Sequence, residues 1–321
     1  MKKIYIKDLK IGDSIFGESF AIKSYVRKAS RNNRPYIDVE LTDKTGSAKG
    51  KVWSDNFSNC EEVKEGDIVE VNATVDEFSG PQLNITNLKK ITDFNIEDFQ
   101  QTSSFDVEKM WREVSDTIEN IKNPHLKKLL KNIFDSETTN LFKYSPAAYR
   151  VHHAYIGGLL EHTWEMLKMA GALKSHFPKI NMDLVYSGII LHDLGKTKEY
   201  VANTTIEITD VGKLLGHIYL GSEWIKSKAP EEMPEDLLNE ILHIVLAHHG
   251  EKEFGSPVFP MTTEAIAVHA LDSASSKMNM AYMNINESLG TDKYTPYVSY
   301  LKTELYRSPY LDEQLNEDIP F

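Results

Sequence analysis

The stretch Leu184–Lys196, LVYSGIILHDLGK, places a histidine and an aspartate directly after an apolar run. The run from Leu184 to Leu191 has the composition of a buried helical segment. His192 and Asp193 close this run, where an ionisable group costs free energy unless it is paired or ligated. The stretch therefore predicts a buried helix that places His192 and Asp193 in the interior of a helical domain.

The same association of an apolar helix with an ionisable side chain recurs along the chain. It is found at His162, His217, His248, His249 and Asp272. A single histidine on an apolar helix is most often a hydrogen-bonded core residue, and a His-Asp dipeptide is common by chance. The joint pattern is much less common, and neutral imidazole with carboxylate is the ligand set of divalent Mn, Fe, Co, Ni and Zn. The pattern thus predicts a metal site.

The adjacent pair His192-Asp193 suggests how two metal ions would be arranged. One carboxylate has two oxygens, so Asp193 can bridge two ions about 3.5–4 Å apart, which together activate a water and stabilise a phosphoryl displacement. His162, His192 and Asp272 would complete one site, and His217 and His248 would belong to the other. Lys196, one helical turn after His192, would add positive charge at a phosphate. Asp193 and Lys196 are accordingly the predicted catalytic residues.

The remaining histidines and the single cysteine are expected to be structural or surface residues. These histidines are His125, His176, His243 and His269. Cys60 has no histidine near it in the sequence that would activate a thiol, so a catalytic role is not expected. One cysteine cannot form an internal disulfide, which excludes a disulfide scaffold and indicates a reducing compartment.

Helical periodicity dominates the chain after residue 105. Apolar residues spaced by three and four predict a helix over 106–121, and Pro124 lies near the start of the next one. The amphipathic helix 106–121 can pack on its own domain, which we favour, or on another subunit. The second arrangement would form a homo-oligomer, and the sequence does not decide between the two. Further helices are expected at 125–134, 147–176, 182–192, 211–228, 235–248 and 262–280 and after Tyr297, with a short hairpin near 200–208.

Residues 14–91 have the alternation of strands instead. Segments such as Tyr36–Leu41 and Asp67–Val75 alternate apolar and polar residues and are rich in β-branched types. Turn sequences such as Asp43-Lys-Thr-Gly46 separate them. About five short strands in about 80 residues fit a small barrel, and the pattern is similar to the oligonucleotide-binding (OB) fold.

The charge of the chain is divided between these two parts. The formal net charge is −12 over 321 residues, which alone would argue against a nucleic-acid partner. Residues 1–90 hold 15 Lys+Arg against 14 Asp+Glu, whereas residues 91–321 hold 21 against 34. Residues 23–51 carry a local excess of five positive charges. Cations with interleaved aromatic rings bind phosphates and bases of single strands, although each aromatic is at least as well explained by burial. The predicted contacts are Lys23, Arg27, Lys28, Arg31, Arg34, Tyr36, Lys51 and Trp53.

The chain lacks the signals of a secreted or membrane protein. The N-terminal sequence MKKIYIKDLKIGDS has no signal-peptide apolar stretch, and no apolar run approaches the roughly 18 residues of a membrane span. We therefore expect a cytoplasmic protein without membrane contact.

The pattern from His162 to Asp272 resembles the HD superfamily of metal-dependent phosphohydrolases. With an OB fold before it, the chain is similar to the YhaM-type 3′→5′ exoribonucleases of Gram-positive bacteria. The most specific stretches are HHAYIGGLLEHT (152–163), HDLGK (192–196) and HHGEKEFGSP (248–257). The resemblance implies a multidomain α and β protein, with an N-terminal OB-fold β-barrel over 1–91, a linker over 92–105 and an all-α HD domain over 106–310. The motif core spans 150–280, and 311–321 form an acidic tail.

The resemblance also implies a set of functional residues. It puts the metal positions at His162, His192, Asp193, His217, His248 and Asp272, with two divalent ions, manganese being favoured over Fe, Co, Ni, Mg or Zn. His152 and His153 are expected near the substrate entrance, and His249 is either a ligand or a phosphate contact. Ser275 stands where a second aspartate is expected, and it is given no metal role. No Gly-Tyr-Pro motif follows His249, which argues against a cyclic-di-GMP substrate.

The implied activity is stepwise hydrolysis of single-stranded RNA, and sometimes DNA, to nucleoside 5′-monophosphates. Two alternatives remain at this point. One is an HD phosphohydrolase of free or cyclic nucleotides, which the basic N-terminal part disfavours because a free nucleotide needs no extended basic face. The other is a non-catalytic single-stranded nucleic-acid-binding replication factor, which the complete ligand set disfavours.

Overall fold

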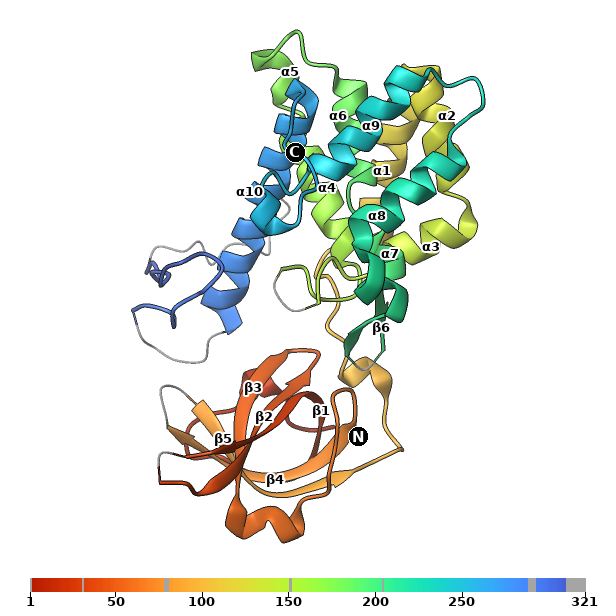
Figure 1. Ribbon diagram of the computed structural model, residues 1–321. Helices are drawn as coiled ribbons and strands as arrows, with labels where there is room; N and C mark the ends of the chain where they lie inside the picture. The colour runs from red at the N-terminus through yellow and green to blue at the C-terminus, as the bar shows by residue number, and fades with distance from the viewer. Residues whose placement is uncertain are drawn as a thin grey trace.

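The structure is a computed structural model that describes residues 2–30, 32–77, 81–149, 152–203, 205–287 and 293–309. It has two parts, a closed five-stranded barrel and a helical domain beside it (Figure 1). This confirms the predicted fold class. Arg31 and the expected acidic tail over 311–321 lie outside the described residues.

The barrel is built from β1 (Ser14–Ala29), β2 (Pro35–Asp43), β3 (Gly46–Trp53), β4 (Ile68–Glu77) and β5 (Pro81–Lys90). The strand order is β1-β2-β3-β5-β4, and pairing of β1 with β4 closes the barrel. Because side chains alternate across a strand, Ile37, Val39 and Leu41 of β2 fill the interior while their neighbours face outward. Two short 3₁₀ helices accompany the strands: η1 (Ile6–Asp8) precedes β1, and η2 (Ser54–Asn59) lies between β3 and β4.

The helical domain packs its helices around one apolar core. Its helices are α1 (Val107–Asn120), α2 (Pro124–Ile133), α3 (Ser136–Tyr144), α4 (Gly158–Ala170), α5 (Leu173–His176), α6 (Met182–Leu191), α7 (Lys196–Glu199), α8 (Asp210–Lys228), α9 (Glu235–Ala247) and α10 (Thr263–Glu287). The hairpin of β6 (Tyr200–Ala202) and β7 (Ile206–Ile208) confirms the predicted one, and the turns η3 (Ile96–Asp98) and η4 (Lys252–Phe254) complete the elements.

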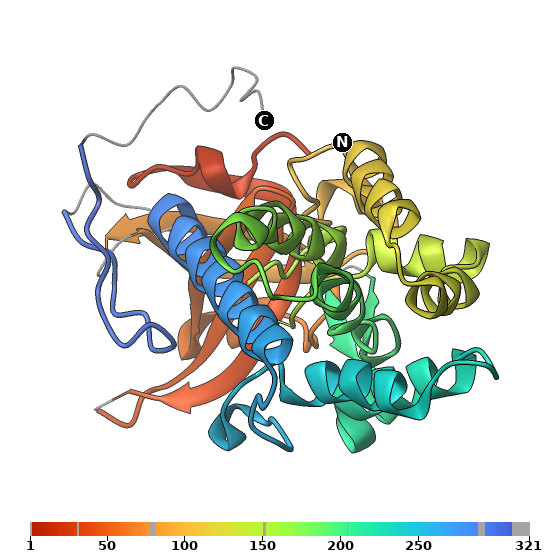
Figure 2. The same cartoon turned by 90° about the horizontal axis from the view of Figure 1, so that it is seen from above.

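Helix α1 packs within its own domain. Its apolar residues Met110, Val114 and Ile118 are buried in the core of the helical domain. Seen from above, α10 runs alongside α4 (Figure 2), and the two helices are in contact. The packing of α4 between α1 and α10 fixes the helix that carries His162.

Two expectations about the helices are wrong, and one helix was not expected. The helix predicted over 147–176 is limited to α4 and the short α5. In the segment before α4, His153 has φ 49° and Gly157 has φ 84°, both incompatible with a continuous helix. The prediction missed α3, which is short and whose N-terminus is capped by the Asp135 side chain. Residues 293–309 contain turns and isolated bridges instead of the helix predicted after Tyr297, and Lys302 within them has φ 55°, outside the helical region.

Specific contacts join the two parts. The Tyr149 hydroxyl donates to Oε2 of Glu65 at 3.0 Å, and the Gln100 amide donates to the Asn203 carbonyl at 3.1 Å. The β6–β7 hairpin reaches from the helical domain toward the barrel (Figure 1). In the described part of the chain, no helix combines the length and the apolar character that crossing a membrane requires.

Candidate metal centre

The predicted ligands come from the ends and inner faces of five helical segments. His162 lies on α4, Asp272 on α10, and His192 and His248 cap the C-termini of α6 and α9. His217 follows Gly216, whose φ of 71° and ψ of 156° interrupt α8. This left-handed conformation favours glycine and turns His217 inward. The structure thus brings together residues up to 110 positions apart, as from His162 to Asp272.

The first cluster contains four of the predicted ligands. The Nε2 atoms of His162 and His192 are 3.2 Å apart, and His162 Nε2 lies 3.3 Å from Oδ1 of Asp272. His192 Nε2 lies 3.2 Å from Oδ2 of Asp193. Both rings are completely buried. The cluster therefore directs two imidazole nitrogens and two carboxylates at one small volume.

The orientation of these imidazoles is fixed from behind. His192 Nδ1 lies 2.7 Å from the Ile189 carbonyl, and His248 Nδ1 lies 2.6 Å from the Val245 carbonyl. Because a carbonyl oxygen can only accept, Nδ1 carries a proton in each ring and Nε2 is the atom presented to the cluster. This is the arrangement that metal-binding histidines need.

His162 is oriented through two side chains instead of a carbonyl. Its Nδ1 lies 2.9 Å from Ser275 Oγ, and the Ser275 hydroxyl donates to Oε2 of Glu165 at 2.6 Å. Since the hydroxyl proton is directed to Glu165, Ser275 Oγ accepts the Nδ1 proton of His162. Ser275 has no metal-facing geometry, but it sets the direction of a predicted ligand.

The second cluster forms on the other oxygen of Asp193. Asp193 Oδ1 lies 3.5 Å from His217 Nε2 and 3.5 Å from His248 Nε2. All three atoms are buried, and none has a hydrogen-bond partner among the described residues. Glu199 Oε2 lies 3.0 Å from Nδ1 of His217, on the side of the ring away from Asp193. Three unpartnered buried ligand atoms around one point fit a divalent cation, since leaving them unpaired is costly.

His249 lies beside this second cluster. Its ring centroid is 5.2 Å from that of His217, and the ligand atoms of His217, His248 and His249 lie within 4.8 Å of one another. Its Nδ1 is held by the Phe254 carbonyl at 2.7 Å, so Nε2 is the free nitrogen. His249 is predicted to be either a metal ligand or a phosphate contact. Both roles require a free Nε2.

The other two predicted substrate-facing histidines differ from each other. His153 is fully buried, and its Nε2 lies 3.2 Å from Oε2 of Glu165. Glu161, also buried, joins His153 and Glu165 in a third group of potential ligands. His152 is partly exposed, and its ring centroid lies 6.0 Å from that of His162. His153 therefore belongs to the support of the first cluster.

The electrostatics of the centre favour charged carboxylates. Burial alone would raise the pKa of Asp193, but Lys196 and His192 hold this pKa well below its usual range. Lys196 Nζ lies 2.7 Å from Oδ2 of Asp193. Burial lowers the pKa of His162 to about 4 and that of His249 to about 3. These two rings are neutral near pH 7, as ligands must be. Burial also lowers the pKa of His248, whereas the pKa of His192 is raised by Asp193 despite its burial.

The glycine of the HDLGK stretch allows two helices to meet. A Cβ on Gly195 would lie 2.0 Å from the His217 carbonyl oxygen and 2.7 Å from the Gly221 nitrogen. No side chain fits in that space, so glycine lets α7 lie against α8. This contact connects Asp193 and Lys196 to the segment that carries His217.

The remaining histidines and the cysteine lie outside the two clusters. His243 Nε2 accepts from the Met261 amide, and His269 Nδ1 lies 2.8 Å from the His248 carbonyl. Burial raises the pKa of the Cys60 thiol to about 11. These three observations agree with structural roles for His243, His269 and Cys60.

The predicted nucleic-acid contacts lie along the barrel. Tyr36 and Trp53 have ring centroids 5.4 Å apart, and Lys51 Nζ lies 5.3 Å from the Tyr36 ring centre. Among the described residues, the other predicted cations are partnered with carboxylates: Lys23 with Glu40, Arg27 with Glu62, Lys28 with Asp38 and Arg34 with Asp55. The local positive excess is thus reduced by acidic neighbours, two of which lie outside residues 23–51.

Sequence reasoning missed the residues that support the predicted ligands. Glu165 is three positions after His162 and Ser275 is three positions after Asp272, so each shares a helix face with a ligand. Glu199 is likewise three positions after Lys196. This spacing was the available signal.

Comparison with protein families now defines the class of protein. Residues 14–91 match an OB-fold nucleic acid binding domain, and residues 159–276 match an HD domain. The chain is therefore an HD-domain protein with an N-terminal OB-fold barrel.

Three curated relatives identify the family within this class. The 3′-5′ exoribonuclease YhaM of Bacillus subtilis is 31% identical over 94% of this chain and 96% of its own length. Those of Listeria welshimeri and Halalkalibacterium halodurans are 32% and 33% identical, over 85% and 81% of this chain and 88% and 83% of theirs. The chain belongs to the YhaM 3′-5′ exoribonuclease family.

Proposed function

We propose that this chain is a metal-dependent 3′→5′ exoribonuclease that hydrolyses single-stranded RNA to nucleoside 5′-monophosphates. The observation that carries this proposal is the position of Asp193, whose two oxygens face two separate histidine clusters. Family membership supplies the substrate class, since the curated relatives are named 3′-5′ exoribonucleases.

Two divalent metal ions, with manganese favoured, are assigned to this centre. His162, His192, Asp193 and Asp272 would hold one ion, and Asp193, His217 and His248 the other, with His249 beside it. When bound, such ions activate a water and stabilise charge on the oxygens of a phosphodiester. The orphaned atoms of Asp193, His217 and His248 support the second position.

The chain's own residues prepare this chemistry. His192 and His248 are held by backbone carbonyls, so their Nε2 atoms are aimed before any ligand arrives. Lys196 adds an ammonium group within the buried centre and is assigned to the phosphate, where positive charge lowers the barrier. His152 is assigned to the wall of the substrate entrance.

The two parts of the chain would share the work. Residues 1–91 are assigned to RNA capture, residues 92–105 to the connection and residues 106–310 to hydrolysis. Single-stranded DNA is a second substrate to be tested beside RNA. A cytoplasmic location is supported by the single cysteine, which suits a reducing compartment.

The direct test uses single-stranded RNA labelled at either end, incubated with the full chain and Mn²⁺ and resolved at single-nucleotide resolution. A 3′→5′ exonuclease shortens 5′-labelled RNA in single steps and releases the 3′ label at once as a mononucleotide. Asp193→Ala should abolish hydrolysis and leave RNA binding measurable. Full activity of that variant, or turnover of free or cyclic nucleotides in place of RNA, would refute the proposal. Binding of RNA without bound metal or hydrolysis would instead identify a replication-type binding factor.

A further inference from the structure

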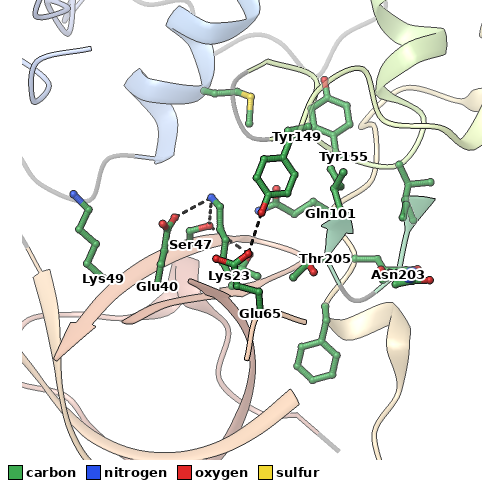
Figure 3. A pocket seen from close by; sticks show the side chains of 18 of the residues that line it. Lys23, Glu40, Ser47, Lys49, Glu65, Gln101, Tyr149, Tyr155, Asn203 and Thr205 are labelled. Atoms are coloured by element: carbon green, nitrogen blue, oxygen red, sulfur yellow. Dashed lines mark hydrogen bonds and ion pairs between the residues drawn. The ribbon is translucent and has the colours of Figure 1, made fainter. Parts of the chain in front are cut away.

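A pocket of about 350 Å³ lies between the barrel and the helical domain (Figure 3). The barrel contributes Lys23, Glu40, Thr42, Ser47 and Lys49 from β1, β2 and β3. The helical domain and the segment before it contribute Gln101, Tyr149, Tyr155, Asn203, Thr205 and Asn284. The pocket therefore exists only where both parts of the chain are present.

The lining of the pocket is rich in uncharged hydrogen-bonding groups. Amides and hydroxyls come from its helical side, and Lys23 is paired with Glu40 at 2.9 Å on the barrel side. With Lys49 and Glu65, the charged side chains of the lining sum to zero. Such a lining suits the sugars and base edges of a nucleic acid better than an isolated phosphate, which would call for an excess of positive charge.

One wall of the pocket is also the wall of the metal centre. Ala154, Tyr155 and Ile156 line the pocket, while the rings of His152 and His153, just before them, lie beside the ring of His162. The ring centroids of these two histidines lie 6.0 Å and 5.2 Å from that of His162. The 3′ end of an RNA strand that leaves the pocket along this wall would therefore arrive beside the first cluster.

The outer face of β2 and β3 extends the pocket in the opposite direction. The register pairs Tyr36 with Trp53, Asp38 with Lys51, Glu40 with Lys49 and Thr42 with Ser47. These residues share one face, because Ile37, Val39 and Leu41 between them are buried in the barrel. The last two pairs line the pocket, whereas the Tyr36–Trp53 ring pair stands at the other end of the same face.

The length of this face suits several nucleotides. Six residue steps separate Tyr36 from Thr42, which is about 20 Å at roughly 3.3 Å per residue of strand. Aromatic rings accept any base by stacking, and OB folds cover about 4–16 nucleotides. Lys51 and Arg34 lie over the Tyr36 and Trp53 rings, with Arg34 Cζ 5.4 Å from the Trp53 ring centre.

We propose that the outer face of β2 and β3 and the interdomain pocket form one continuous track for single-stranded RNA. The track holds an upstream base on Tyr36 and Trp53 and the nucleotides next to the 3′ end in the pocket. It then delivers the 3′ end to the metal centre along residues 152–156. This inference rests on the proposed exoribonuclease function for the direction of the strand, and it adds the location of the substrate.

Photocrosslinking tests the track without requiring hydrolysis. A single 4-thiouridine is placed at successive positions from the 3′ end of an RNA, and crosslinks are mapped on the full chain kept free of metal with a chelator. Positions next to the 3′ end should crosslink to Tyr155 or Gln101, and positions farther upstream to Tyr36 or Trp53. Crosslinks on another face of the barrel, or the reverse order, would overturn the proposal.

A blocking variant tests the pocket in the active enzyme. Thr205 lies in the pocket lining on the β6–β7 connection, so Thr205→Trp should fill the pocket. Val201 of the same hairpin is 40% exposed and is not part of that lining, which makes Val201→Trp the matched control. We expect at least a tenfold loss of kcat/KM on RNA for Thr205→Trp alone. Hydrolysis of bis(p-nitrophenyl) phosphate, a small diester that needs only the metal centre, should stay within twofold in Val201→Trp, and the ratio of RNA to diester hydrolysis should fall at least tenfold in Thr205→Trp alone.

The outcomes separate this inference from the proposed function. Equal RNA hydrolysis by Thr205→Trp and Val201→Trp overturns the track and leaves the exoribonuclease intact. Ordered crosslinks in a protein that degrades no RNA with any divalent metal would retain the track and refute the exoribonuclease.

Discussion

Ser275 Oγ accepts a hydrogen bond from Nδ1 of His162 at 2.9 Å. The Ser275 hydroxyl in turn donates to Glu165, which lies 110 positions earlier in the chain. The sequence comparison with HD proteins led us to expect an aspartate at this position. A carboxylate at this position would fix the orientation of the imidazole directly. Here Ser275 fixes it, and Glu165 fixes Ser275. His153, at 3.2 Å from Glu165, extends the same chain of contacts.

This relationship predicts the effect of removing the hydroxyl. Ser275→Ala should weaken Mn²⁺ binding at the first cluster by about 10–100-fold, the range found when partners of metal ligands are removed. Thr163→Val is the matched control, because the Thr163 hydroxyl, next to His162 in the chain, donates to the Leu159 carbonyl of its own helix. Isothermal titration with Mn²⁺ measures both. Unchanged affinity in Ser275→Ala would show that Ser275 and Glu165 do not orient His162.

The close approach of α7 and α8 predicts a stability difference between two glycines. Gly195→Ala should destabilise the fold by about 1–3 kcal/mol or more, because the new Cβ would meet the His217 carbonyl. At Gly171, where φ is −54° and the nearest contact of a Cβ would be 3.4 Å, alanine should be neutral or stabilise by up to about 1 kcal/mol. Urea unfolding of both variants checks this prediction. Equal midpoints would contradict it.

The aromatic pair on the barrel predicts a loss of RNA affinity. Trp53→Ala should weaken single-stranded RNA binding by about 1–3 kcal/mol, the value of one stacked base. Phe16, which is 77% exposed on β1 and lies away from β2 and β3, provides the control variant Phe16→Ala. Fluorescence anisotropy with labelled RNA gives the dissociation constants. A similar loss in both variants would remove the special role of Trp53.

The environment of Cys60 predicts a pH-dependent reactivity. Burial raises the pKa of this thiol to about 11, so the reactive thiolate is a very small fraction of the total at pH 7.5. The rate of alkylation by iodoacetamide in the native protein should therefore keep rising by about tenfold per pH unit, up to at least pH 9.5. Mass spectrometry after timed quenching measures it. A plateau near pH 8.5 would indicate an ordinary thiol.

Much of the site was accessible from the sequence because its chemistry is local. Each ligand is an ionisable residue within or at the end of an apolar segment, and this contrast survives without knowledge of the fold. The alternation of Ile37, Val39 and Leu41 with polar neighbours likewise predicts a strand with one buried face. The barrel and the helical domain follow from these patterns.

The supporting residues were marked in the sequence only by their spacing from other site residues, because their contacts depend on packing between distant helices. Ser275 reaches His162 only when α10 lies against α4, and Glu199 reaches His217 only when Gly195 lets α7 approach α8. The charge count over residues 23–51 failed for a related reason. Asp55 and Glu62 lie outside that segment but pair with Arg34 and Arg27, so a sum along the chain overstates the positive surface.

The shared carboxylate of Asp193 has a consequence for how the protein responds to metal supply. In the proposed two-ion arrangement, the carboxylate that would serve the first cluster through Oδ2 is the same one whose Oδ1 faces His217 and His248. Occupancy of the two positions should consequently be coupled, which a metal titration would record as a Hill coefficient different from one. The response of such an enzyme to intracellular metal would then differ from that of a protein with two independent sites.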